Sequence, residues 1–275
     1  MFNVQLNNLD LKARGFNKIC AIGDIHGCLT ELEELLSLIP RDSLLLFLGD
    51  LPDRGPDSIG SIRYVSSLVD SGKAICLMGN HDETYLRYRK HVNKQAQDPK
   101  YKIPMNLSPE KQTIYTRMTN EDFRFLSEMP YMVSFLSGKD SWVAVHAGID
   151  SNYSLEQQAK GTLTHIRYVN STTGQPMSMG PKFTIPEGAI PWTEYYTGST
   201  NILYGHSVYD KVTITVKQNS AILIGVDTGC CFGMTLSAVA LDIEDNDSQE
   251  IKYFSVKAKE KYKEMQYGKD KSGTD

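Results

Sequence analysis

The sequence predicts an α/β fold in which helices cover a largely parallel sheet. Three short apolar runs, at residues 18–24, 44–48 and 73–80, alternate with two segments whose apolar residues recur at helical spacing. Strands that alternate with helices along a chain pair in parallel. Crossovers between such strands are right-handed in about 98% of cases, so the three strand ends are expected to face the same edge of the sheet.

Each element follows from local composition. KICAIGD (18–24) is a short apolar run closed by Gly-Asp, which predicts a strand. Residues 28–40 predict a helix, because leucines recur every three or four positions until Pro40 ends the pattern. The next elements are a strand at 44–48, a helix from about 56 to 69 and a strand at 73–80. Further strands, expected in a second sheet, are predicted at 141–148, 201–207, 212–216 and 221–229.

The composition limits the class of protein. The chain has 275 residues and a net charge of −4, so a full core is expected and indiscriminate binding to nucleic acid or to a membrane surface is not. The N-terminus lacks an apolar signal segment, and no run of 18 apolar residues occurs. Five cysteines, an odd number, indicate buried thiols in a reducing compartment rather than a disulfide framework. We therefore expect a soluble, cytoplasmic monomer.

We expect one catalytic domain over residues 1–256, followed by a polar, lysine-rich tail at 257–275 that is mobile. A polar helical insertion occupies about 86–130, and the residues SPEKQ within it predict a helix that starts with Pro109 in its first turn. The basic residues of this insertion form either a rim for polyanions or a solvated helix face. The aromatic residues of a long polar loop at 165–200 either stack on a ligand or pack the loop down.

Polar side chains follow five of the predicted strands. Glycine ends the first three runs and is followed at once by an acid or an amide, and histidines follow two later runs. The six candidate ligands are Asp24, His26, Asp50, Asn80, His146 and His206. Ligand sites in open α/β sheets lie beyond the carboxyl ends of the strands, so these side chains are expected to converge on one edge.

Three histidines, two aspartates and one asparagine form a nitrogen and oxygen ligand set that suits manganese, iron, zinc or nickel. The absence of cysteine from the set argues against a structural zinc site. Six ligands are too many for one open catalytic ion but suit a pair of ions bridged by a carboxylate. Two divalent ions would outweigh the charge of Asp24 and Asp50, so the site would attract a phosphate and lower the pKa of a bound water.

Five motifs at these positions resemble those of the calcineurin-like metallophosphoesterases. The motifs are GDIHG (23–27), GDLPDRG (49–55), GNHD (79–82), HAGI (146–149) and YGHS (204–207). More narrowly, they look like the phosphoprotein-phosphatase branch in its bacterial and phage form. The resemblance covers residues 18–241 and implies a β-sandwich of two mixed sheets flanked by helices, with a dinuclear metal site.

The resemblance also implies a role for each matching residue. One metal would be held by Asp24, His26 and Asp50, and the other by Asp50, Asn80, His146 and His206, so that Asp50 bridges the pair. Manganese is the metal that we expect first. Arg54 matches the phosphate-binding arginine, His81 the general acid and Asp53 the partner of that acid. Arg167, in a looser match, resembles a second arginine that contacts the phosphate.

Two departures from the family pattern stand out. Pro52 replaces the apolar residue that usually precedes the aspartate of the DRG motif, and its fixed φ could shift Arg54. Ser207 and Val208 follow His206, so the second histidine of the wider superfamily is absent. This absence fits the phosphoprotein-phosphatase branch.

Three functions are compatible with the residues. The first, and the one that we expect, is a phosphatase acting on phosphoprotein serine or threonine. The alternative is a symmetrical diadenosine-tetraphosphate hydrolase, and DTGCCFG (227–233) is similar to a segment of such enzymes. The third is a pseudoenzyme that binds phosphorylated partners, which the complete ligand set disfavours. In each case the partner is a phosphorylated molecule.

Overall fold

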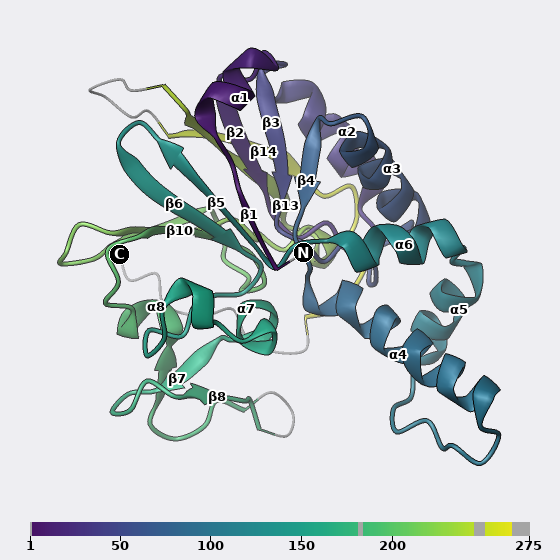
Figure 1. Cartoon of the computed structure of the whole chain (residues 1–275). Coiled ribbons are helices and arrows are strands. Elements are labelled where there is room, and N and C mark those ends of the chain that lie inside the picture. The colour runs from purple at the N-terminus through teal and green to yellow at the C-terminus, as the bar shows by residue number, and fades with distance from the viewer. Residues whose placement is uncertain (1, 181–183, 245–250, 266–275) are drawn as a thin grey trace.

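The computed structural model describes residues 2–180, 184–244 and 251–265. Two sheets pack face to face and helices lie against their outer sides (Figure 1). The predicted α/β fold, a sandwich of two mixed sheets flanked by helices, is therefore confirmed. In these described ranges, no helix combines the length and apolar character needed to cross a membrane.

The five-stranded sheet has the order β14-β13-β2-β3-β4. Its strands are β2 (Lys18–Ile22), β3 (Ser43–Phe47), β4 (Ala74–Cys76), β13 (Thr235–Asp242) and β14 (Lys252–Lys257). The first three pair in parallel, as the alternation of strands and helices predicts. β13 lies antiparallel to β2 and makes the sheet mixed.

The second sheet has six strands in the order β1-β5-β6-β10-β12-β11. Its strands are β1 (Asn3–Gln5), β5 (Met132–Ser137), β6 (Asp140–Val145), β10 (Asn201–Tyr204), β12 (Ile222–Gly225) and β11 (Thr213–Val216). All four later runs predicted from the sequence lie in this sheet. β6, β10 and β12 are mutually parallel, so their carboxyl ends share one edge.

Successive residues of the central strands face two different cores. In β2, Ile19 and Ala21 pack between the sheets with residues such as Trp142 of β6, whereas Cys20 and Ile22 pack on the side of the helices. A strand buried on both faces needs apolar residues at consecutive positions. This explains the unbroken apolar runs in the sequence.

The two helices predicted from the first part of the chain are α2 (Leu29–Leu38) and α3 (Ser58–Asp70), and both begin and end close to the predicted bounds. The sandwich also contains α1 (Asn8–Ala13), α7 (Lys160–His165) and α8 (Trp192–Tyr195), which were not predicted. α2 packs on β13 and β14, and α3 packs on β4. On the other sheet, the ring of Trp192 lies 5.1 Å from that of Tyr204 in β10.

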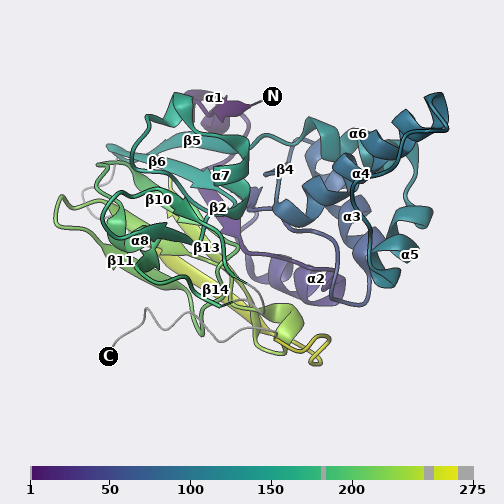
Figure 2. The same cartoon turned by 90° about the horizontal axis from the view of Figure 1, so that it is seen from below.

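Two groups of elements project from opposite sides of the strand ends (Figure 1, Figure 2). One is the predicted insertion at about 86–130, which contains the later turns of α4 (Asn80–Gln97) together with α5 (Pro109–Arg117) and α6 (Asn120–Glu128). Ser108 caps α5 and Pro109 lies in its first turn, as predicted. The other is the small sheet of β7 (Tyr168–Asn170), β8 (Pro176–Met177) and β9 (Ala189–Pro191). Trp192 and Tyr196 of this loop region are buried, so they pack it down.

Residues 258–265 belong to the segment that the sequence assigns to a mobile tail. In the structure they lie against the catalytic body. The backbone N–H groups of Tyr262 and Lys263 donate to Cys231 O, and Tyr262 Oη donates to the buried Glu31. The hydrogen bonds from Lys259 N and Tyr262 Oη to Glu31 place this segment against α2, on which β14 also packs. Residues 266–275 of the predicted tail lie outside the described residues.

Candidate metal centre and active site

The six predicted ligand residues lie together at the carboxyl ends of strands from both sheets. Asp24 follows β2 and Asp50 follows β3, whereas His146 follows β6 and His206 follows β10. Asn80 is the first residue of α4, which follows β4. The Asp, His and Asn side chains therefore reach one place from five separate strand ends.

One group of ligand atoms surrounds Oδ2 of Asp50. His26 Nε2 lies 3.6 Å from this oxygen and 3.8 Å from Asp24 Oδ2. The other ring nitrogen of His26 lies 3.0 Å from the carbonyl oxygen of Pro52 and donates its proton there. Nε2 is consequently the acceptor nitrogen and faces the carboxylates. Pro52, the departure from the family pattern, thus orients a candidate ligand.

A second group surrounds the other oxygen of Asp50. His146 Nε2 lies 3.5 Å from Asp50 Oδ1, 3.1 Å from Asn80 Oδ1 and 3.2 Å from His206 Nδ1. His146 Nδ1 donates to the carbonyl of Leu48 at 2.8 Å, so Nε2 carries a lone pair. His146 Nε2, Asp50 Oδ1 and Asn80 Oδ1 are all acceptors that face one another, and a cation at their centre removes the repulsion between them.

The pKa shifts of the three histidines also fit a bound metal ion. Burial lowers the pKa of His26, His146 and His206, and the charges of Arg54 and Arg167 lower those of His26 and His206 further. Neutral imidazole is the form of histidine that binds metal ions.

The pKa of the buried acid Asp24 shifts in the opposite direction. Burial raises the pKa of Asp24 well above its usual value, and the charges of Asp227 and Asp50 add to this effect. A bound cation would relieve this charge repulsion. Two clusters, His26 with Asp50 and His81, and Asp50 with His146 and His206, could each hold a metal ion.

The backbone at the centre is strained. Five site residues have left-handed φ angles: His26 (47°), Asp50 (52°), Asp53 (75°), Arg54 (71°) and His206 (62°). Non-glycine residues rarely adopt this conformation, and such strain concentrates at functional sites. The buried carboxylate of Asp82 supports it by accepting the N–H groups of Asp50, Leu51 and Gly79 at 2.7, 3.2 and 3.0 Å. Asp82 lies in the GNHD motif, but no role was predicted for it.

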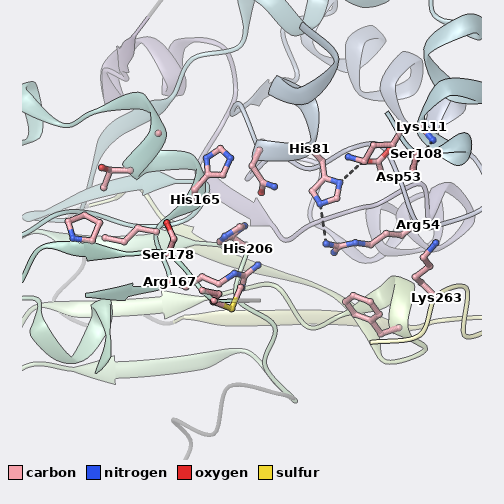
Figure 3. Close-up of a pocket in the computed structure, with 18 of the residues that line it drawn as sticks. Asp53, Arg54, His81, Ser108, Lys111, His165, Arg167, Ser178, His206 and Lys263 are labelled. Atoms are coloured by element: carbon pink, nitrogen blue, oxygen red, sulfur yellow. Dashed lines mark hydrogen bonds and ion pairs between the residues drawn. The ribbon is translucent and has the colours of Figure 1, made fainter. Parts of the chain in front are cut away.

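Arg54 and His81 lie beside the ligand cluster (Figure 3). Arg54 Nη1 lies 2.6 Å from His26 Nε2, and Nη2 lies 3.1 Å from His81 Nε2. His81 Nδ1 lies 2.5 Å from Asp53 Oδ2. Arg54 therefore points into the centre despite the proline two residues before it.

Three residues of this constellation were missed by the sequence analysis. Tyr85 Oη donates to Asp53 Oδ1, and Lys111 Nζ lies 2.5 Å from Asp53 Oδ2. Glu110 Oε1 accepts the backbone N–H of Arg54 at 3.0 Å. Lys111 and Glu110 come from the first turn of α5, about sixty positions away in the chain. The SPEKQ sequence indicates where α5 starts, but it does not indicate which residues the side chains of α5 contact.

A cavity of about 980 Å³ opens over the centre. Its lining includes Asn80, His81, Arg54, Arg167, His206 and Lys111. Arg167 Nη1 lies 3.4 Å from Ser207 Oγ, next to the candidate ligand His206. His165, for which no role was predicted, also lines the cavity (Figure 3). The basic residues at 87–102 are absent from the lining within the described ranges, so the insertion contributes through α5.

Residues 17–210 match the family described as calcineurin-like phosphoesterase. The chain belongs to this family. It is therefore a hydrolase, and the resemblance seen in the motifs is confirmed.

Individual relatives carry more specific names. The chain is 31% identical over 241 residues to the asymmetrical bis(5'-nucleosyl)-tetraphosphatase of Oceanobacillus iheyensis. The matched region covers 80% of this chain and 87% of the relative. It is 24% identical to the symmetrical enzyme of Ralstonia nicotianae, over 81% and 89% of the two chains. A crystal structure of a candidate diadenosine tetraphosphatase superposes with a TM-score of 0.67 at 24% identity, covering 94% of this chain and 98% of that one. This last likeness shows the fold.

Proposed function

We propose that this phosphoesterase hydrolyses dinucleoside tetraphosphates. The observation that supports this most is the 31% identity, over four fifths of the chain, to an enzyme named as an asymmetrical bis(5'-nucleosyl)-tetraphosphatase. The sequence alone favoured a serine/threonine protein phosphatase and gave the symmetrical diadenosine-tetraphosphate hydrolase as the alternative. The named relatives favour the alternative substrate, and the higher identity to the asymmetrical enzyme favours unequal products.

The ligand residues fit two divalent ions, for which manganese is our first choice. Asp24, His26 and Asp50 would hold one ion, and Asp50, Asn80, His146 and His206 the other. When bound, such a pair polarises a phosphoryl group and activates a water.

The other residues bind and orient the substrate. Arg54 and Arg167 lie on two sides of the ligand cluster, where each can donate to phosphoryl oxygens. His81 is placed to give a proton to the leaving oxygen, and the carboxylate of Asp53 holds its ring by accepting from Nδ1. The cavity of about 980 Å³ is at the upper end of the range for ligand pockets, which suits a long substrate.

The test is to offer the manganese-loaded protein diadenosine tetraphosphate and a phosphoserine peptide side by side. We expect kcat/KM for the tetraphosphate to be higher by about 10²-fold, a usual extent of substrate discrimination. The products should be a nucleoside triphosphate and a monophosphate. Faster turnover of the phosphopeptide would overturn the proposal in favour of a protein phosphatase, and two diphosphate products would overturn the asymmetrical assignment.

A further inference from the structure

We propose that Lys111 of the inserted helix α5 is a positioning residue for phosphoryl transfer. It holds the Asp53 carboxylate and, through it, keeps the His81 ring in the orientation needed for proton donation. The inference rests on the proposed role of His81 as the proton donor and is independent of which phosphorylated substrate the enzyme prefers.

The carboxylate of Asp53 is buried, with 2% of its surface exposed, and receives three donors. Tyr85 Oη donates to Oδ1. His81 Nδ1 and Lys111 Nζ each lie 2.5 Å from Oδ2. Lys111 and His81 therefore meet at the same oxygen. Without Lys111, Tyr85 and His81 alone would fix the carboxylate, one on each oxygen, and Oδ2 would lose its charged partner.

The helix that carries Lys111, α5, contacts the loop that carries Asp53 and Arg54. Ser108 Oγ accepts the backbone N–H of Lys111 at 3.3 Å, which places this residue in the first turn of α5. The neighbouring Glu110 accepts the N–H of Arg54 at 3.0 Å through Oε1, and its Oε2 lies 2.7 Å from Lys263 Nζ. Consecutive residues of α5 thus contact consecutive residues of the loop, 110 with 54 and 111 with 53. This register fixes the lysine relative to Asp53.

The contact has a consequence for His81. Its Nδ1–H donates to Asp53, so Nε2 faces Arg54 and the cavity, 3.1 Å from Nη2. A ring held in this way presents Nε2 to the leaving oxygen of a bound substrate. Because Lys111 also lines the cavity and has three donors, direct contact with the substrate is the competing role. The two roles predict different kinetics.

A double-mutant cycle on aryl phosphates with different leaving groups separates them. Lys111→Met should lower kcat on phenyl phosphate by about tenfold, a part of the roughly 10²–10⁴-fold contribution of a general acid, with little change in KM. The loss on p-nitrophenyl phosphate should be smaller, because its leaving group needs a proton less. Lys111→Arg should restore most of the rate. In a His81→Asn background, Lys111→Met should cause no further loss.

The matched control is Lys263→Met, which removes a cavity lysine that contacts Glu110 instead of Asp53. Its rates should depend on the leaving group as in the wild type. A loss that is equal for all leaving groups, a loss that adds to that of His81→Asn, or no loss at all would overturn the inference. A protein phosphatase would show the same Lys111 pattern, so failure of the proposed substrate is a separate result.

A spectroscopic measurement does not depend on turnover. In the zinc-loaded, diamagnetic protein, the Nδ1–H proton of His81 should give a strongly downfield NMR signal because of its 2.5 Å contact with Asp53. The signal should persist in Lys111→Arg and move or broaden in Lys111→Met. An unchanged signal in Lys111→Met would show that Asp53 and His81 keep their geometry without the lysine, which contradicts the inference.

Discussion

The strand-end loops, up to Asn80 and His81 at the start of α4, and the insertion at about 86–130 build the same site in different ways. The loops supply Asp24, Asp50 and His206, which are buried and held in place by backbone hydrogen bonds and left-handed φ angles at Asp50 and His206. The insertion is mostly polar and exposed, and it reaches the centre through α5, where Lys111 is half-buried. The loops therefore place candidate metal ligands, and the insertion places a partner of the proposed proton donor.

Because the two regions place different groups, we expect substitutions in them to impair the enzyme in different ways. A change in a strand-end loop should remove metal and all activity together. A change in the insertion should leave the ligand cluster intact and alter either proton donation or the stability of the helices. Variants in the two regions can break or sharpen this comparison.

The largest effect is expected from Asp50→Asn. Asp50 is the candidate ligand whose two oxygens face separate groups, at 3.6 Å from His26 and 3.5 Å from His146. Replacing one oxygen by an amide nitrogen weakens the ligand set on at least one side. Hydrolysis of every substrate should fall below detection, and elemental analysis should show less than the wild-type metal content. An active variant with two tightly held metals would contradict the bridging role.

The strand-end loops could be predicted from the sequence, whereas the contacts of the insertion could not. The strand ends were readable because a buried strand gives an unbroken apolar run, and a glycine followed by an acid marks its end; Asp24 and Asp50 were found in this way. Asn80 was found because it follows Gly79 after the third run, and His146 because it follows the apolar run WVAV directly. The sequence could place these residues on one edge, since parallel strands share their carboxyl ends.

The contacts of α5 could not be predicted from the sequence, because they depend on tertiary packing. Lys111 belongs to a short polar helix, and nothing in the local pattern indicates what its side chain reaches. The contact with Asp53 depends on how α5 packs against α3 and the loop, which is a tertiary property. β13 was missed as well, although its apolar run pairs with β2 at the centre of the sheet. The acid Asp82 was visible in its motif, but its three backbone acceptor contacts appear only in three dimensions.

An intermediate effect is expected from His81→Asn, because it lies where the two regions meet. A serine alkoxide needs a proton to leave, and general-acid help is worth about 10²–10⁴-fold. A nucleoside phosphate that leaves from an anhydride is already a stable anion. Turnover of an alkyl phosphomonoester should therefore fall much more than turnover of a dinucleoside tetraphosphate.

Metal content must be measured in the same His81→Asn samples, since His81 adjoins Asn80. If both metals are retained and the two substrates lose rate equally, the general-acid assignment is wrong and His81 only positions the substrate. If metal is lost, His81 belongs with the strand-end ligands, and the division between the regions shifts by one residue.

The smallest effect is expected from Asp122→Asn, which loosens the insertion without touching the centre. Asp122 lies in the first turn of α6, is 4% exposed and accepts the N–H of Thr119 at 2.8 Å. Arg63 of α3 donates to both carboxylate oxygens, at 3.1 and 3.0 Å. The variant should lose about 1 kcal/mol of unfolding free energy at pH 7, a usual value for a helix-capping contact whose arginine is half exposed. Its kcat should stay near that of the wild type.

The pH dependence of that loss identifies its cause. Burial acts to raise the pKa of Asp122, but the hydrogen bonds from Arg63 and Thr119 outweigh it and lower the pKa below 3.8. A carboxyl whose pKa is lowered by folding stabilises the protein above its unfolded pKa, and the stabilisation disappears as the pH falls through the folded value. Urea titrations should therefore show a gap between wild type and Asp122→Asn that is largest at pH 7 and shrinks below about pH 3.8. Asp70→Asn, at the exposed end of α3, is the matched control and should show little change at either pH. A gap of equal size at pH 7 and pH 3 would mean that shape, and not the charge of Asp122, ties the inserted helices to the sandwich.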